Sequence, residues 1–327
     1  LKRTMDLFET NFTNWDWLIV TVYLCVSILI GLWANRYVGN LSDYLVAGRT
    51  LRLRLALATM TGTELGLVTV MYSAQLGFTK QFASLYIVVI EVAALLAIGL
   101  TGLVVYRLRQ EAVLTIPEYY ERRYSRGVRV TGAVMMVVAG VLNMGVFLKA
   151  GSLFLVAITG LEDPLALKWI MTGLLVLVLF YTVLGGMVSV VITDLIQFLV
   201  LGVGTLIVSG YVLESLGWIE GLWEIGVAGA YINPLEPDNP TTRDVEGDGV
   251  GLLMIGAQVV AITCAVMLWP AGVSRTLAVK SPRIAQRLYL YSAVPFLARR
   301  ALPALWGIGA FAFLMAHPDL KMQFEAQ

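Results

Sequence analysis

Charged side chains stand inside several of the most apolar stretches of this sequence. Glu64, Glu91, Lys149 and Asp194 each lie within a long apolar run. A charge inside an apolar helix is costly, so such residues usually mark an ion or solute pathway, or pair with an opposite charge. Asp194 could bind a cation or a proton, whereas Glu64 and Glu91 could favour a cationic, amine or hydroxyl-rich solute or be paired internally. Lys149 lies near the end of its run, where a long side chain can reach the interface.

The surroundings of Glu64 are unusual for a continuous helix. Residues 58–66 read ATMTGTELG, with three threonines and two glycines beside the carboxylate. Glycine loses backbone entropy in a helix, and threonine hydroxyls compete for backbone hydrogen bonds. The pattern predicts a discontinuous helix whose freed carbonyls can coordinate a cation. The alternative is an unbroken helix that packs its small residues against a neighbour.

Two further segments carry polar groups among apolar residues. Asp194 follows the pair Gly185 and Gly186, which predicts a tight turn, and Gln197 lies on nearly the same helix face. Pro270 removes a backbone donor, so it predicts a break or an end in the helix that carries Thr263 and Trp269. Two broken helices that face each other would enclose a central binding site.

The composition is that of an integral membrane protein. Apolar residues make up 58% of 327 positions, charged residues 14%, and the mean hydropathy is +0.80. The net charge of +1 gives no reason to expect a nucleic-acid partner. Cys25 and Cys264 are predicted to be buried thiols, and neither a metal cluster nor a catalytic triad is present. We therefore expect no enzyme activity and no obligate protein partner.

Eight stretches are long and apolar enough to span a bilayer as helices, which predicts an all-α fold. They are residues 16–34, 55–78, 83–106, 128–158, 165–184, 187–212, 249–271 and 293–316. Residues 216–248 are polar and acidic and are predicted to form an extracellular loop.

The basic residues predict the orientation. Most of the 23 Lys and Arg residues lie in three connections, at 35–54, 107–129 and 272–300, which eight spans would place on one side. Basic connections stay in the cytoplasm, so the N-terminus is predicted to be extracellular and the protein a multi-pass protein of the cell membrane. Arg299 and Arg300 interrupt the start of the last stretch. We interpret them as snorkelling side chains at a helix that begins near Ala301.

Four motifs resemble those of the sodium:solute symporter family, which includes sodium–sugar, sodium–proline and sodium–sialic acid carriers. Residues 41–49 read LSDYLVAGR, similar to the family's DYxxAGR, and residues 115–124 read TIPEYYERRY, similar to TIPEfxxxRY. Residues 185–197 read GGMVSVVITDLIQ, similar to GGlxaVxxTDxxQ, and residues 274–281 read SRTLAVKS, similar to QRxLAaKs. Their order and spacing extend the resemblance over nearly the whole chain.

The resemblance implies a LeuT-type fold of two inverted five-helix repeats with the binding site between broken helices. Residues 1–327 would then form a single, incomplete transmembrane domain. Residues 16–34 would be an extra leading helix, 55–212 the first repeat and 249–316 the start of the second. The chain resembles a C-terminally truncated member, with the remaining helices beyond Gln327.

The resemblance also implies a set of site residues. Sodium would be held by the backbone carbonyls of Ala58 and Thr61, with Asp194 as the family's fifth-helix aspartate that supports sodium coupling. The hydroxyl partners of that site would lie beyond Gln327. The implied solute contacts are Thr63, Glu64, Glu91, Asn143, Thr263 and Trp269.

The implied function is sodium-coupled symport of a small polar organic solute across the cytoplasmic membrane. From the residues alone, a proton is the alternative coupling ion at Asp194. A different class of function is a transporter-like sensor domain of a membrane signalling protein, and the sequence beyond Gln327 would discriminate between the two. A channel would require a pore motif, which the sequence lacks.

Overall fold

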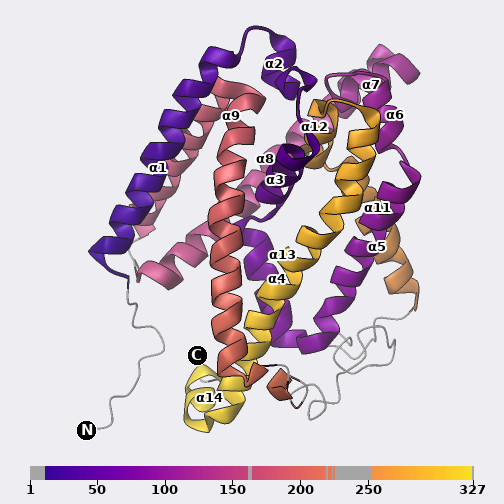
Figure 1. Cartoon of the computed structure of the whole chain (residues 1–327). Helices are drawn as coiled ribbons and strands as arrows, with labels where there is room; N and C mark the ends of the chain where they lie inside the picture. The colour runs from indigo at the N-terminus through magenta and orange to yellow at the C-terminus, as the bar shows by residue number, and fades with distance from the viewer. Residues whose placement is uncertain (1–11, 161–163, 219, 223, 225–251, 326–327) are drawn as a thin grey trace. The chain divides into compact units, whose positions relative to one another are not determined.

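The computed structural model describes residues 12–160, 164–218, 220–222, 224 and 252–325, and Figure 1 gives their path. In these ranges the regular secondary structure is helical. The chain divides into two compact units. The first unit comprises Leu1–Leu51 and Glu111–Thr193, and the second comprises Arg52–Gln110 and Asp194–Gln327. Most of the predicted loop 216–248 lies outside the described residues.

The first unit contains long apolar helices and short connecting helices. Its elements are α1 (Asn14–Ala34), η1 (Asn35–Tyr37), α2 (Leu41–Val46), η2 (Ala47–Arg49), α7 (Ile116–Arg123), α8 (Arg126–Thr159) and the part of α9 (Pro164–Ser215) up to Thr193. No residue of α8 is buried, although the helix is strongly apolar. An apolar helix that exposes its surface in this way is suited to contact with lipid.

The glycine motif produces the predicted turn inside α9. Gly186 has φ 50° and ψ −145°, which separates α9 into two helical stretches. A Cβ at Gly186 would collide with Tyr44 of α2, so glycine is required by both the backbone conformation and the close packing. The motif at 41–49 therefore packs against the motif at 185–197 within this unit.

The motif at 115–124 is a helix start. The Thr115 hydroxyl accepts a hydrogen bond from the Glu118 N–H at 3.3 Å and caps α7. The Glu118 carboxylate accepts from the Leu114 N–H at 2.7 Å and pairs with Arg122 at 2.5 Å. Partial burial alone would raise the pKa of Glu118, but these two partners outweigh it and lower that pKa below its usual value.

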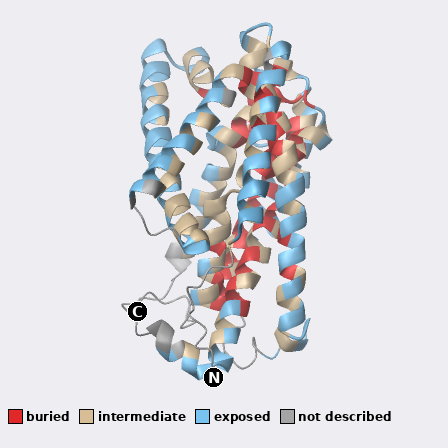
Figure 2. Ribbon diagram, turned by 90° about the vertical axis from the view of Figure 1, so that its left-hand side faces the viewer, coloured by how far each residue is buried: buried red, intermediate tan, exposed pale blue. Residues whose placement is uncertain are grey.

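The second unit is built around one long helix, α13 (Pro282–Ala316), which contacts α3, α4, α5 and α6. Its other elements are α3 (Leu53–Glu64), α4 (Leu67–Lys80), η3 (Gln81–Ser84), α5 (Leu85–Thr101), α6 (Val105–Gln110), α9 from Asp194, α11 (Leu252–Leu268), α12 (Pro270–Ala278) and α14 (Pro318–Glu325). Many of its residues are buried, and they appear red in Figure 2.

Small residues allow α13 to approach its neighbours closely. A Cβ at Gly77 of α4 would meet the Ala304 backbone, and one at Gly307 would meet the Ala74 carbonyl. A Cβ at Gly99 of α5 would meet Leu290. Packing of this kind is how helices associate where the surrounding lipid offers no hydrophobic driving force.

Both helices predicted to break are discontinuous. α3 ends at Glu64, Leu65 has non-helical φ −85° and ψ 63°, and α4 begins at Leu67. α11 ends at Leu268 and α12 begins at Pro270, with a bend of 43° between them. At Glu64 the structure thus favours a discontinuous helix over continuous packing, and at Pro270 it shows a bend followed by a further helix.

Seven of the eight predicted stretches lie wholly within the described residues and are mainly helical, and so is the described part, residues 252–271, of the stretch 249–271. By length and apolar composition, five of the described helices could cross a membrane, or six if α11 and α12 form one bent span. The difference arises because the structure joins or shortens several stretches: residues 165–212 lie in the single kinked helix α9, for example.

Two predictions about single residues were wrong. α13 begins at Pro282, so Arg299 lies in mid-helix and is buried rather than snorkelling at an end. Cys25 and Cys264 are free and exposed. Apolar sequence surroundings do not predict burial in a membrane helix, because the face turned to lipid is apolar as well.

Candidate functional site

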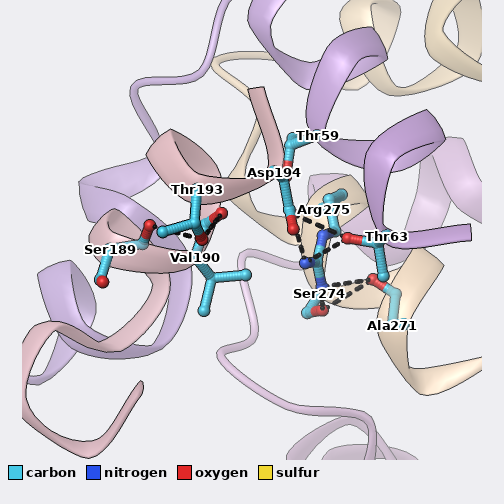
Figure 3. Close-up of polar contacts among 9 residues, drawn as sticks. All are labelled: Thr59, Thr63, Ser189, Val190, Thr193, Asp194, Ala271, Ser274 and Arg275. Carbon is cyan, nitrogen blue, oxygen red and sulfur yellow. Dashed lines mark hydrogen bonds and ion pairs between the residues drawn. The ribbon is translucent and has the colours of Figure 1, made fainter. Parts of the chain in front are cut away.

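Asp194 forms the centre of a buried polar cluster in the second unit (Figure 3). Its Oδ2 atom accepts hydrogen bonds from the hydroxyls of Thr59 and Thr63, the latter at 2.8 Å. These two threonines lie four residues apart on α3 and therefore share one helix face. A Cβ at Gly62, between them, would collide with the Asp194 carbonyl oxygen, so glycine permits the close contact of α3 and α9.

Arg275 of α12 supplies the opposite charge. Its Nη2 atom lies 2.8 Å from Asp194 Oδ2 and 2.6 Å from the Thr63 hydroxyl oxygen. The two charged side chains are 7% and 8% exposed. A buried ion pair is tolerated only when each charge is compensated, and here the pair and its hydroxyl partners form a neutral group. Oδ1 of Asp194 has no recorded hydrogen-bond partner among the described residues.

A second buried cluster joins α3, α5 and α13. Arg299 pairs with Glu91 through Nη2 and with Glu64 through Nη1 at 3.3 Å, and Arg300 pairs with the other Glu91 oxygen through Nε. The Arg299 guanidinium also lies 4.0 Å from the centre of the Phe296 ring. Two carboxylates and two guanidinium groups give a cluster with no net charge.

This second cluster also stabilises the broken helix. Where a helix ends, its last carbonyls lose their intrahelical partners. Arg299 Nη1 donates to the Glu64 carbonyl at 2.9 Å, and the Thr69 hydroxyl donates to the same oxygen at 3.2 Å. A cation at a helix C-terminus is also favoured by the helix dipole. The end of α3 is therefore held in place by α13.

The three predicted sodium ligands do not form one cluster in this conformation. Ala58 and Thr61 are buried in α3, before the break, and the Thr61 carbonyl accepts a hydrogen bond from the Leu65 N–H at 2.8 Å. Thr61 lies two residues from Thr59 and from Thr63, so its side chain projects from another side of the helix. Its buried hydroxyl has no hydrogen-bond partner in the part of the chain that the structure describes. Asp194 is bound by Thr59, Thr63 and Arg275 instead.

The six predicted solute contacts are distributed over the two units. Thr63 belongs to the Asp194 cluster, and Glu64 and Glu91 belong to the Arg299 cluster. Thr263 lies on α11, and Trp269 lies at the bend before α12 with 41% of its surface exposed. Neither joins the two clusters described above. Asn143 lies on α8 in the first unit.

Four residues of these clusters are not predicted as site residues from the sequence: Thr59, Arg275, Arg299 and Arg300. The four-residue spacing of Thr59 and Thr63 was an available signal, because it places both hydroxyls on one face. The arginines were counted with the basic connections. The structure places Arg275 and Arg299 at 6% and 5% exposure instead, so they are partners for the intramembrane carboxylates.

The model of the sodium:solute symporter family matches residues 44–325. The chain belongs to the sodium:solute symporter family. This is a family of membrane transporters, which agrees with the expectation that the protein is not an enzyme. It also agrees with a multi-pass membrane protein, since several of the described helices are apolar enough to cross a bilayer.

Similar proteins include sodium-coupled carriers of different solutes. The chain is 26% identical over 330 residues to the sodium/glucose cotransporter of Vibrio parahaemolyticus, which covers 97% of this chain and 58% of the relative. It is 29% identical to a putative sodium-dependent multivitamin transporter of Drosophila melanogaster, over 67% of this chain and 36% of the relative. It is 32% identical to the human sodium/iodide cotransporter, over 60% and 31%. The chain thus spans about a third to just over half the length of these relatives.

The fold is similar to that of a solved Na+-coupled sialic acid symporter in a substrate-bound, outward-open state. The TM-score is 0.77 at 19% identity, and the match covers 93% of this chain and 62% of that one. At this identity the likeness establishes the fold alone. It confirms the LeuT-type helical fold that the four motifs imply.

Proposed function

We propose that the protein containing this chain is a symporter that uses a sodium gradient to carry a small polar organic solute into the cell. Membership of the sodium:solute symporter family and the similarity to sodium-coupled carriers support the coupling ion. The proposed orientation in the cell membrane has an extracellular N-terminus, as the basic connections predict.

The observation that carries the proposal is the last turn of α3. Thr63 there belongs to the Asp194–Arg275 cluster, and the next residue, Glu64, belongs to the Arg299–Glu91 cluster. Adjacent residues at the end of a broken helix therefore contact the two different buried clusters. Any shift of this turn alters both clusters, which supplies a physical link between an ion site and a solute site.

For sodium, we propose the oxygen ligands implied by the family: the carbonyls of Ala58 and Thr61, with Asp194. A hard cation prefers oxygen ligands, and unwound backbone near a helix break is a common source of them. The buried hydroxyl of Thr61 and the Oδ1 atom of Asp194 are oxygens without a recorded partner in the described residues. Binding of sodium by these carbonyls requires the helix to open further toward its N-terminus than in this conformation.

For the solute, we propose Thr63 and Glu64 at the break between α3 and α4, Glu91 of α5, Thr263 of α11, and Trp269 at the break between α11 and α12. Asn143 on α8 is proposed as a further contact. Polar groups at helix breaks can bind a polar solute because their backbone partners are already incomplete. In this conformation Glu64 and Glu91 are held by arginines, so solute binding would compete with or extend these ion pairs.

The test is uptake of labelled solutes by the full-length protein in proteoliposomes. A panel of sugars, amino acids, monocarboxylates and inorganic anions is offered in sodium or in choline buffer. We expect at least one solute to be taken up much faster in sodium. Asp194→Asn is expected to reduce sodium-dependent uptake per molecule of folded, inserted protein; the amount of that protein is measured alongside, because the variant leaves the buried charge of Arg275 unpaired. Equal uptake in sodium and choline for every solute would contradict the proposal.

A further inference from the structure

A small cavity lies beside the Arg299–Glu91 cluster in the second unit. It is lined by Ser73, Ser84 and Arg300 together with apolar side chains that include Ile87 and Val88. The part of the cavity that the centre of a water molecule can occupy measures about 10 Å³. That volume holds about one water-sized group, so the cavity fits a chemical group of a ligand rather than a whole sugar.

Of the three polar residues that line the cavity, Ser73 and Arg300 carry hydrogen-bond donors without a partner among the described residues. Ser73 is 4% exposed, and its buried hydroxyl has no hydrogen-bond partner among the described residues. Buried polar atoms are normally paired, so this hydroxyl is a donor available to a water molecule or to a ligand group in the cavity. Ser84 differs, because its hydroxyl donates to the Gln81 carbonyl at 2.6 Å.

Arg300 provides the second set of donors. Its Nε binds Glu91, whereas its two Nη atoms have no recorded partner among the described residues. A guanidinium group presents its donors in a planar fork that suits a carboxylate or another compact anion. Arg300, Ser73 and apolar side chains thus line the same small space.

The local charges explain why an anion would bind together with a cation. The Glu64, Glu91, Arg299 and Arg300 side chains have no net charge, and neither do Asp194 and Arg275. An anion added alone would leave an unbalanced negative charge in a region of low dielectric constant. An anion bound with one sodium ion leaves the interior neutral.

We propose that Ser73 and Arg300 form a binding site for a monovalent anionic group, supplied by a solute carboxylate or by a small inorganic anion, and that sodium strengthens its binding. This inference rests on the proposed sodium-coupled symport and names an anionic substrate class, organic or inorganic, for it. It also assigns Ser73 a role that neither its residue type nor the family motifs predicted.

The test measures anion binding to the purified full-length protein from the ligand-induced rise in its unfolding temperature. Choline propionate, choline bromide and glucose are each titrated at one fixed sodium concentration, and each is titrated again with choline in place of sodium. Wild-type protein is expected to bind propionate or bromide more tightly in sodium. Ser73→Ala is expected to weaken that binding about tenfold, equivalent to about 1.4 kcal/mol, because a hydrogen bond to a charged group is lost.

Ser292→Ala is the matched control. Ser292 is a fully buried serine of α13 that contacts Met60 and lies outside the cavity lining. This variant is expected to bind the anion as the wild type does. Since the Ser73 hydroxyl has no partner among the described residues, Ser73→Ala is not expected to lower the unfolding temperature without ligand.

The outcomes separate the two proposals. Binding of propionate alone identifies a solute carboxylate, and binding of bromide as well identifies a general anion site; both support the inference if Ser73→Ala weakens them. Equal anion binding by wild type and Ser73→Ala would overturn it, as would binding of glucose but of neither anion. In the glucose case sodium-dependent binding would still support symport, whereas the absence of sodium-dependent uptake of every solute refutes the proposed function itself.

Discussion

Removing Arg275 is the sharpest perturbation of the Asp194 cluster. In Arg275→Gln, the Asp194 carboxylate keeps the hydroxyls of Thr59 and Thr63 but loses its buried counter-charge. Breaking a buried ion pair from one side typically costs about 3–5 kcal/mol. We therefore expect the variant to be considerably less stable than the wild type in sodium-free buffer.

Sodium should reverse part of that loss if Asp194 supports a cation site. A ligand that binds only the folded state stabilises it by about 2.7 kcal/mol at a concentration 100 times its dissociation constant. In Arg275→Gln the Asp194 carboxylate has no counter-charge, so it should bind sodium more readily than the paired carboxylate of the wild type. Sodium is thus expected to raise the unfolding temperature of the variant by more than that of the wild type.

The assay is thermal unfolding of the full-length protein in sodium and in choline at equal ionic strength. The control is the double variant Asp194→Asn with Arg275→Gln, which removes both charges. It is expected to recover much of the stability and to lose the extra response to sodium. An equal sodium response in Arg275→Gln and in the double variant would refute the role of Asp194 in cation binding.

Two other substitutions test the packing and the proposed solute site. Gly62→Ala places a Cβ against the Asp194 carbonyl and should cost about 1–3 kcal/mol, measured as a lower unfolding temperature, whereas Gly66→Ala, whose Cβ would meet nothing within 4 Å, should be tolerated better. Similar losses for both would contradict the close contact of α3 and α9. Glu64→Gln weakens the pairing with Arg299 and should change solute affinity more than sodium affinity in uptake assays. A lower stability with both affinities unchanged would identify Glu64 as purely structural.

The sequence predicted the broken helices because the cause of each break is local. The glycines and threonines around Glu64 and the proline at position 270 weaken a helix through their own backbone chemistry. The exact end of α3 was less predictable. Its last carbonyl, at Glu64, is satisfied by Arg299, which lies 235 residues later in the chain. Long-range pairing of this kind decides where a weakened helix stops.

The sequence predicted which carboxylates lie inside apolar helices, but not which residues they pair with. An intramembrane carboxylate indicates either a ligand site or an ion pair, and the sequence of one helix cannot distinguish them. The structure pairs Asp194 with Arg275 and Glu91 with Arg299 and Arg300. From the sequence alone, arginines in or beside a basic connection are expected to be solvated and to mark the cytoplasmic side. Only the packing of α12 and α13 shows that these arginines are buried.

The most direct test of the account is uphill transport by the full-length protein in sealed proteoliposomes. A solute identified by the uptake panel is placed at equal concentration inside and outside, and an inward sodium gradient is then imposed. We expect the solute to accumulate inside and to leave again when a sodium ionophore collapses the gradient. A solute concentration that stays equal on both sides while the sodium gradient persists would contradict sodium-coupled symport.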